Sequence, residues 1–238
     1  MRKILLTSGC SFTATDWWSD YHPSLDTSWP KWPELLAEKL DMDLINVAYS
    51  GAGNEYIYSS LLDKIMTTDN IGLVMAAWTQ STRRDWERKG KWFNNANSLF
   101  KTEQNPFSND VNACIDKTLR YYYSLQEICK YKKIPYKAFQ MLHIIRGWSW
   151  DRKFPGDLSK TEIESRPEHL QKIVNSIYCE KIDDSFLGWP GDTGIGGFCI
   201  KADILGYGNE EYEISERDNH PSKLGQEKIT EFIYDRLG

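Results

Sequence analysis

The sequence predicts an α/β fold, a three-layer α/β/α sandwich around a central, mainly parallel sheet of about five strands. Three short apolar segments, each typical of a strand, alternate with two helical segments over residues 3–78. The crossovers between these strands are long enough for parallel pairing. A chain of 238 residues with 40% hydrophobic and 26% charged residues is typical of a globular protein, and we expect a single domain over residues 1–238.

The first half of the chain supplies three strands of this sheet. Residues 3–7 and 44–47 are short apolar runs. Residues 71–78 are almost continuously apolar, which indicates a strand buried on both faces. Leucine and isoleucine recur at helical spacing over residues 33–40 and 55–66, which predicts a helix in each crossover.

The second half is less regular. Residues 85–110 are polar and rich in asparagine, and we expect an irregular segment there. An amphipathic helix is predicted over residues 111–132, a fourth parallel strand over residues 136–142, and a last helix over about residues 222–237.

Residues 146–215 are predicted to form a large insertion near the C-terminal edge of the sheet. Several Gly and Pro residues interrupt this segment, which holds one predicted helix over residues 167–179. A segment of this length at that edge is where a lid or a substrate-recognition region would lie.

Charge and cysteine content exclude several classes of function. The formal net charge of −5 argues against a nucleic-acid partner, because a phosphate-binding surface needs clustered Lys and Arg. No apolar stretch has the length of a signal-peptide core or a membrane span, so we expect a cytoplasmic protein with no membrane partner, or a component of a virion. The cysteines are odd in number and lack metal-ligand spacing, which predicts reduced thiols: Cys10, Cys114, Cys129, Cys179 and Cys199. The four histidines suggest no metal site either.

A serine and a histidine at opposite ends of the chain are the candidates for chemistry. Ser11 follows the first predicted strand, and His220 precedes the last predicted helix. Both positions can meet at the C-terminal edge of a parallel sheet, where ligands bind. A serine hydroxyl needs a base to become nucleophilic, and His220 can be that base. The backbone N–H groups of Ser11 and Gly51 can stabilise the oxyanion, and the side-chain amide of Asn54 can add a donor.

The order and spacing of these segments resemble those of the SGNH/GDSL hydrolase family. The chain looks like a divergent member of that family, similar to proteins often carried by bacteriophages. The family's first block, with its catalytic Ser, is matched by Gly9-Cys10-Ser11-Phe12, and its second block, with an oxyanion Gly, by residues 46–54. Its last block is matched by Asp218-Asn219-His220-Pro221. The resemblance spans nearly the whole chain. It implies the SGNH fold, related to flavodoxin-like sheets, a Ser-His-Asp mechanism and no cofactor.

The third block of the family departs from the pattern. It usually reads Gly-x-Asn-Asp at the end of a strand, and its Asn donates to the oxyanion. Residues 76–83 contain no Asn, so Thr79 or Gln80 would take over that donation. Loss of one oxyanion donor typically costs on the order of 10²–10³ in rate, which makes a weak or retired enzyme an alternative.

The acid of the triad is also displaced. The family usually has it three residues before the His, where this chain has Arg217. Asp218, two residues before, is the nearest carboxylate, and Glu216 is the second choice. The carboxylate orients the imidazole and takes no proton itself, so such a shift is tolerable.

Each of these residues also has a structural interpretation when taken alone. A serine after a strand is commonly a helix N-cap, as Ser11 would be, and Gly51 would serve a turn. His220 would belong to a loop before a helix. Only their conjunction favours catalysis.

Two hypotheses of different classes follow from the sequence. The first is a serine esterase that hydrolyses a small-molecule or glycan acyl ester. The aromatic residues behind Ser11 favour O-acetylated carbohydrate, because they present large rigid faces: Trp17, Trp18, Trp29 and Trp32. The second is a non-catalytic binding or structural protein on the same scaffold, associated with a virion. The acyl group, the alcohol and the oligomeric state are left open.

Overall fold

A computed structural model describes residues 2–95, 110–145, 166–190 and 197–237. A parallel sheet of four strands lies at its centre, in the order β2-β1-β3-β6. The strands are β1 (Ile4–Ser8), β2 (Asp43–Asn46), β3 (Ile71–Trp78) and β6 (Tyr136–Gln140). Every neighbouring pair is parallel, so all four strands end at one edge, where the segments around Ser8, Asn46 and Trp78 come together.

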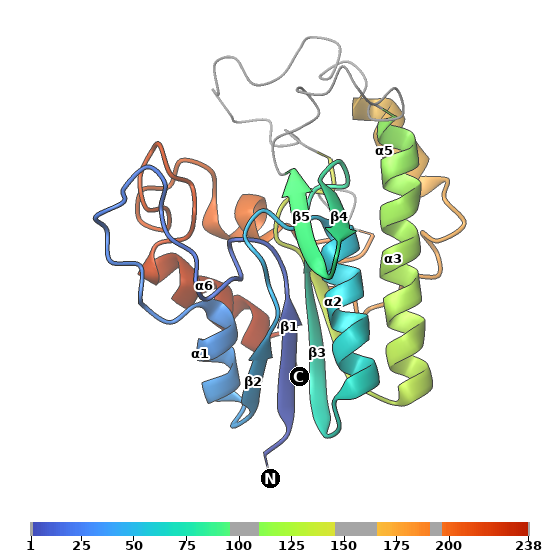
Figure 1. Ribbon diagram of the computed structural model, residues 1–238. Helices are drawn as coiled ribbons and strands as arrows, with labels where there is room; N and C mark the ends of the chain where they lie inside the picture. The colour runs from blue at the N-terminus through green and yellow to red at the C-terminus, as the bar shows by residue number, and fades with distance from the viewer. Residues whose placement is uncertain (1, 96–109, 146–165, 191–196, 238) are drawn as a thin grey trace.

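Helices cover both faces of the sheet, which gives the expected three layers (Figure 1). One layer contains α1 (Trp32–Lys39) and the C-terminal α6 (Lys223–Tyr234), and the other contains α2 (Asn54–Thr67) and α3 (Val111–Lys132). The predicted fold class is confirmed, and β3 and α3 have the predicted bounds.

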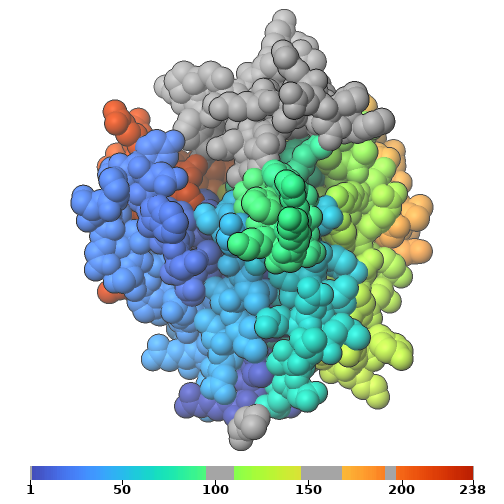
Figure 2. Space-filling model, in the orientation of Figure 1, coloured from blue at the N-terminus to red at the C-terminus, as the bar shows by residue number. Residues whose placement is uncertain are grey.

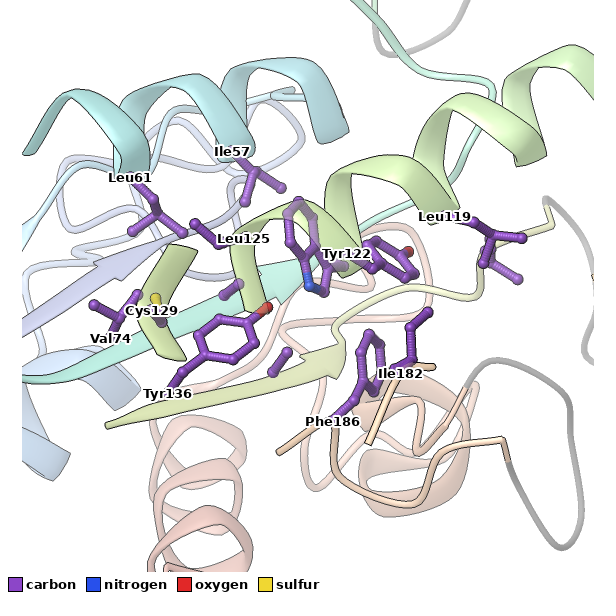
Figure 3. Close-up of a cluster of buried hydrophobic side chains, with 14 of the residues drawn as sticks. Ile57, Leu61, Val74, Leu119, Tyr122, Leu125, Cys129, Tyr136, Ile182 and Phe186 are labelled. Carbon is purple, nitrogen blue, oxygen red and sulfur yellow. The ribbon is translucent and has the colours of Figure 1, made fainter. Parts of the chain in front are cut away.

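Strand periodicity divides the core into two clusters. Leu5 packs with α1 and α6, and Leu6 points to the opposite face, against α2 and α3, because successive side chains of a strand alternate between faces. Figure 3 shows the α2/α3 cluster, in which the rings of Tyr122 and Phe186 are 5.1 Å apart. Full burial of each such side chain stabilises the fold by about 1.5–3 kcal/mol.

The sheet has one strand fewer than expected. Two short segments of the 146–215 region lie along β6 instead, with isolated parallel bridges from Ala138 to Phe186 and from Gln140 to Cys199. Backbone hydrogen bonds from Ala138 N to Ser185 O, 2.8 Å, and from Gln140 N to Phe198 O, 3.0 Å, cover this edge. In the described part of the chain, these two isolated bridges stand in the place of the expected fifth strand.

The described parts of the 146–215 region are built into the core. Helix α5 (Arg166–Val174) buries Ile173 in the α2/α3 cluster, and the π-helix η1 (Ile200–Leu205) buries Ile200 in the α1/α6 cluster. Residues 146–165 and 191–196 lie outside the described residues. A lid or recognition role for this region stays a prediction.

A β-hairpin occupies part of the segment expected to be irregular. Strands β4 (Arg84–Arg88) and β5 (Lys91–Asn95) pair antiparallel across Lys89 and Gly90, which have φ values of 53° and 72°. Positive φ at both turn residues is the geometry that tight hairpins prefer. The prediction was wrong for residues 85–95 because the strands are polar, and residues 96–109 of that segment lie outside the described residues.

The hairpin is anchored on the first turn of α2. Asp85 accepts hydrogen bonds from Gly53 N, 2.8 Å, and from Tyr56 N, 2.9 Å. These N–H groups have no partner within the helix, so the carboxylate caps it.

No helix in the described part of the chain is both long and apolar enough to span a membrane.

Candidate active site

The turn after β1 presents Ser11 at the C-terminal edge of the sheet. The N–H groups of Thr13 and Ala14 donate to Cys10 O at 2.8 and 3.0 Å, which closes one tight turn. A Cβ on Gly9 would lie 2.4 Å from Thr13 Oγ1, so the turn requires glycine there. Cys10 is fully buried and unpaired, whereas the Ser11 hydroxyl faces the loop before α6.

That loop carries His220 and folds back on itself. Ile214 N donates to His220 O at 3.0 Å, and Ser222 N donates to Tyr212 O at 2.9 Å. Ser222 also caps α6 by accepting from Gly225 N at 3.1 Å, as the capping preference of serine leads one to expect. Packing of α6 against α1 thus fixes the loop beside the Ser11 turn.

Ser11, His220 and Asp218 form one hydrogen-bonded chain. Ser11 Oγ is 2.8 Å from His220 Nε2, and His220 Nδ1 is 2.6 Å from Asp218 Oδ1. An ionised carboxylate can only accept, so Nδ1 carries the proton and Nε2 is left to accept from the serine hydroxyl. The three residues predicted to be catalytic therefore lie in hydrogen-bond contact, in the tautomer that a serine nucleophile needs.

Asp218 is held as a carboxylate although it is buried. Its side chain is 2% exposed, and burial alone would raise its pKa. Hydrogen bonds from His220 and Ser19 outweigh burial and lower the pKa of Asp218 to about 2. The other acidic candidate, Glu216, is exposed, as is Arg217, so the carboxylate two residues before the histidine is the one directed at the ring.

Three polar residues that sequence reasoning missed complete a ring around Asp218. Ser19 donates to Asp218 Oδ2 and accepts from His22 N at 3.0 Å. His22 Nε2 is 2.7 Å from Ser215 Oγ, which accepts from Asp218 N at 3.1 Å. No sequence motif marks these residues, because the contacts join segments almost 200 positions apart.

Two aromatic rings contact the histidine. Trp17 stacks on His220 with ring centroids 4.2 Å apart, and Phe12 lies at 4.8 Å in a tilted arrangement. Both aromatic side chains are buried, and His220 remains 23% exposed. The rings fix the plane of the imidazole and leave its Nε2 edge to Ser11.

Two backbone N–H groups at this edge are available as donors. Neither the N–H of Ser11 nor that of Gly51 donates to another residue in the described ranges. The turns that carry them touch, since Tyr49 N donates to Gly9 O at 3.1 Å. Unpaired backbone N–H groups are uncommon in buried residues such as Ser11. Two such donors at one sheet edge are what an oxyanion hole contains.

The other predicted oxyanion residues differ in their surroundings. The amide of Asn54 donates to Thr79 O at 3.0 Å and to Thr118 Oγ1 at 3.3 Å, so both of its hydrogens are used inside the protein. Thr79 is fully buried, and its hydroxyl has no hydrogen-bond partner among the described residues. Gln80 is half-buried beyond the end of β3.

The described residues do not gather three His, Cys, Asp or Glu side chains in a group that could hold a metal ion. The groups that they do bring together at this edge are a serine hydroxyl, an imidazole, a carboxylate and backbone N–H donors.

Comparison with solved structures identifies the fold. A G-D-S-L family protein from Desulfitobacterium hafniense superposes with a TM-score of 0.53 at 13% identity, covering 98% of this chain and 99% of that one. The chain has an SGNH-like fold. Esterase EstA from Pseudoalteromonas sp. gives a TM-score of 0.52 at 14% identity, covering 99% of this chain and 96% of that one.

An acetyl xylan esterase, AlAXEase, is as similar to this SGNH-like chain, with a TM-score of 0.52 at 13% identity over 99% of this chain and 100% of that one. No known family model and no curated protein matches the sequence. At these identities the likeness concerns the fold, and the expected relation to bacteriophage proteins stays a prediction.

Proposed function

We propose that the protein is a serine esterase of SGNH type. The observation that carries the proposal is the continuous hydrogen-bond chain from Ser11 through His220 to Asp218, with distances of 2.8 and 2.6 Å. A serine without a base is inert at neutral pH, and this chain supplies the base and its orienting acid.

The proposed reaction is acyl transfer to the serine, then to water. Ser11 Oγ attacks the ester carbonyl carbon while His220 Nε2 takes the hydroxyl proton. The negative oxygen of the tetrahedral intermediate accepts from the N–H groups of Ser11 and Gly51, with Thr79 or Gln80 as the candidates for a third donor. The intermediate collapses, and His220 protonates the leaving alcohol. Water then releases the acyl group by the same steps, and Asp218 stays ionised throughout.

Support for an O-acetylated carbohydrate substrate comes from the loop that carries Ser19. Trp18 and Tyr21 are 68% and 67% exposed in it, a few residues from the ring of Trp17 that stacks on the histidine. Large exposed aromatic faces match the apolar faces of sugar rings. The acetyl xylan esterase among the structural neighbours is in keeping with this substrate class.

The test is release of p-nitrophenol from its acetate ester. We expect turnover by the wild type and a loss to background in Ser11→Ala and in His220→Ala. Ser28→Ala and His169→Ala are matched controls, since Ser28 is exposed and His169 lies in α5, and both should keep full activity. Equal rates in all five folded proteins would overturn the proposal.

The absence of an Asn after β3 favours a second candidate, a binding or structural protein that retains the scaffold. The segment after Trp78 offers Thr79 and Gln80 in its place. This candidate predicts no turnover of acetylated sugars by the wild type, together with binding of the same sugars that survives Ser11→Ala.

A further inference from the structure

The β4–β5 hairpin presents an exposed aromatic pair on its outer face. Trp86 and Phe93 are cross-strand partners, and their rings lie nearly parallel, with centroids 6.1 Å apart and an interplanar angle of 12°. They are 47% and 44% exposed. Figure 2 shows the hairpin (green) on the molecular surface, over the region of α2.

The inner face of the hairpin fixes this pair in place. Asp85 binds two N–H groups at the start of α2, and Trp92 packs edge-on against Tyr56 at 5.3 Å. Asn94 donates to Ser50 O at 2.9 Å. Strand side chains alternate between faces, so with these residues turned inward Trp86 and Phe93 point outward from a rigid support.

The same anchor joins the hairpin to the candidate active site. A Cβ on Gly51 would lie 2.5 Å from Asn94 Oδ1, so the hairpin packs directly on the turn that offers the proposed oxyanion donor. The outer face of the hairpin therefore belongs to the same element that contacts this turn, on the side opposite to the contact.

Positive charge collects beside the aromatic pair. Arg88 and Lys91 are cross-strand partners one step along the same face from Trp86 and Phe93. Arg88, Lys89 and Lys91 are all exposed, against one exposed acid, Glu87, in a chain whose net charge is −5. The hairpin tip is thus a local cationic surface on an acidic protein, which attracts anions to this place.

We propose that the outer face of the β4–β5 hairpin binds an acidic polysaccharide, a chain of sugar rings that carry carboxylates. The apolar face of a pyranose ring stacks on Trp86 and Phe93, and a carboxylate at the edge of a ring pairs with Arg88 or Lys91. A single-stranded nucleic acid combines stacking and charge as well, but it needs a basic track along its backbone. Three cations on one hairpin of an acidic chain favour the polysaccharide.

This proposal deepens the proposed esterase function, because the bound polymer would be the carrier of the hydrolysed ester. Binding is nonetheless measurable without turnover. A wild-type protein that hydrolyses the ester but does not bind the polysaccharide refutes the hairpin site alone. A wild-type protein that binds the polysaccharide but does not hydrolyse the ester refutes the esterase alone.

The experiment is titration of the full-length protein with polygalacturonate by calorimetry and by affinity electrophoresis. We expect wild-type binding that weakens as salt rises, and about tenfold or greater weakening in the double variant Trp86→Ala/Phe93→Ala. Arg88→Gln/Lys91→Gln should weaken binding and flatten its salt dependence. Tyr131→Ala, which removes an 88% exposed aromatic side chain on α3, should bind as the wild type does.

Three results would overturn the proposal. One is no binding of polygalacturonate by the wild type. Another is equal affinity of the wild type and of the charge variant Arg88→Gln/Lys91→Gln, because these exposed side chains can be replaced without disturbing the fold. The third is tighter binding of a single-stranded oligonucleotide than of polygalacturonate, which would assign the surface to nucleic acid.

Discussion

Replacement of Asp218 by asparagine tests the electrostatics of the site through protein stability. The carboxylate is 2% exposed and accepts from His220 Nδ1, His220 N and Ser19 Oγ. Against the opposing effect of burial, these donors lower the pKa of Asp218 from the ordinary 3.8 to about 2. A group whose pKa is depressed by folding stabilises the folded state above its unfolded pKa, and this stabilisation disappears as pH falls through the folded pKa.

The size of the effect follows from that shift. The difference between 3.8 and about 2, at about 1.36 kcal/mol per pKa unit, corresponds to roughly 2 kcal/mol of unfolding free energy. Because Asp218 is buried, solvent screening does not reduce this figure substantially. The amide introduced by Asp218→Asn cannot ionise, so the difference in stability between wild type and variant should shrink by roughly 2 kcal/mol between pH 5 and pH 2.

The assay is urea denaturation of both proteins at intervals across this pH range, followed by circular dichroism. It requires no substrate and separates the electrostatic argument from the question of activity. A stability difference that stays constant from pH 5 to pH 2 would refute the reasoning, because it would mean that the carboxylate titrates alike in the folded and unfolded chains.

Three further substitutions have defined outcomes. Ser19→Ala should lower kcat about 10- to 100-fold at unchanged KM, and Ser19→Thr, which keeps the hydroxyl, should retain most of the wild-type kcat. A wild-type kcat in Ser19→Ala would show that the hydroxyl is dispensable. Lys201→Met removes the partner cation of the buried Glu213 carboxylate and should lower the free energy of unfolding, measured by urea denaturation, by about 3–5 kcal/mol. Adding Glu213→Gln should recover part of that loss, and no recovery would contradict the explanation by an unpaired buried charge. Gly51→Ala should lower the thermal unfolding midpoint more than Gly90→Ala does, because both glycines have positive φ but only Gly51 has a close neighbour. Equal decreases in the two variants would contradict the expected clash with Asn94.

Local patterns predicted the elements whose burial is simple. The apolar run of β3 and the amphipathic pattern of α3 predicted the observed bounds, Ile71–Trp78 and Val111–Lys132, because both elements contact the core along their whole length. The β4–β5 hairpin was not predicted because its strands bury little, and one of its main contacts is a carboxylate on a helix N-terminus. Such a contact leaves no periodicity in the sequence.

The candidate site divides in the same way. Ser11 and His220 are marked by their places, directly after the first strand and directly before the last helix. Ser19 and His22 lie in a loop without periodicity, and they reach Asp218 and Ser215 only through the folded chain. Asn54 was expected to donate to a substrate, but its amide bonds the backbone beyond β3, a use that no sequence pattern reveals.

The most direct test of the central claim is covalent labelling of the protein with a fluorophosphonate, followed by mass spectrometry of the peptides. Only a serine activated by a base reacts readily with this reagent. We predict one adduct, on Ser11, that is absent from His220→Ala and unchanged in His169→Ala. A wild-type protein that stays unlabelled, or that is labelled on a different serine, would contradict the assignment of Ser11 as the nucleophile.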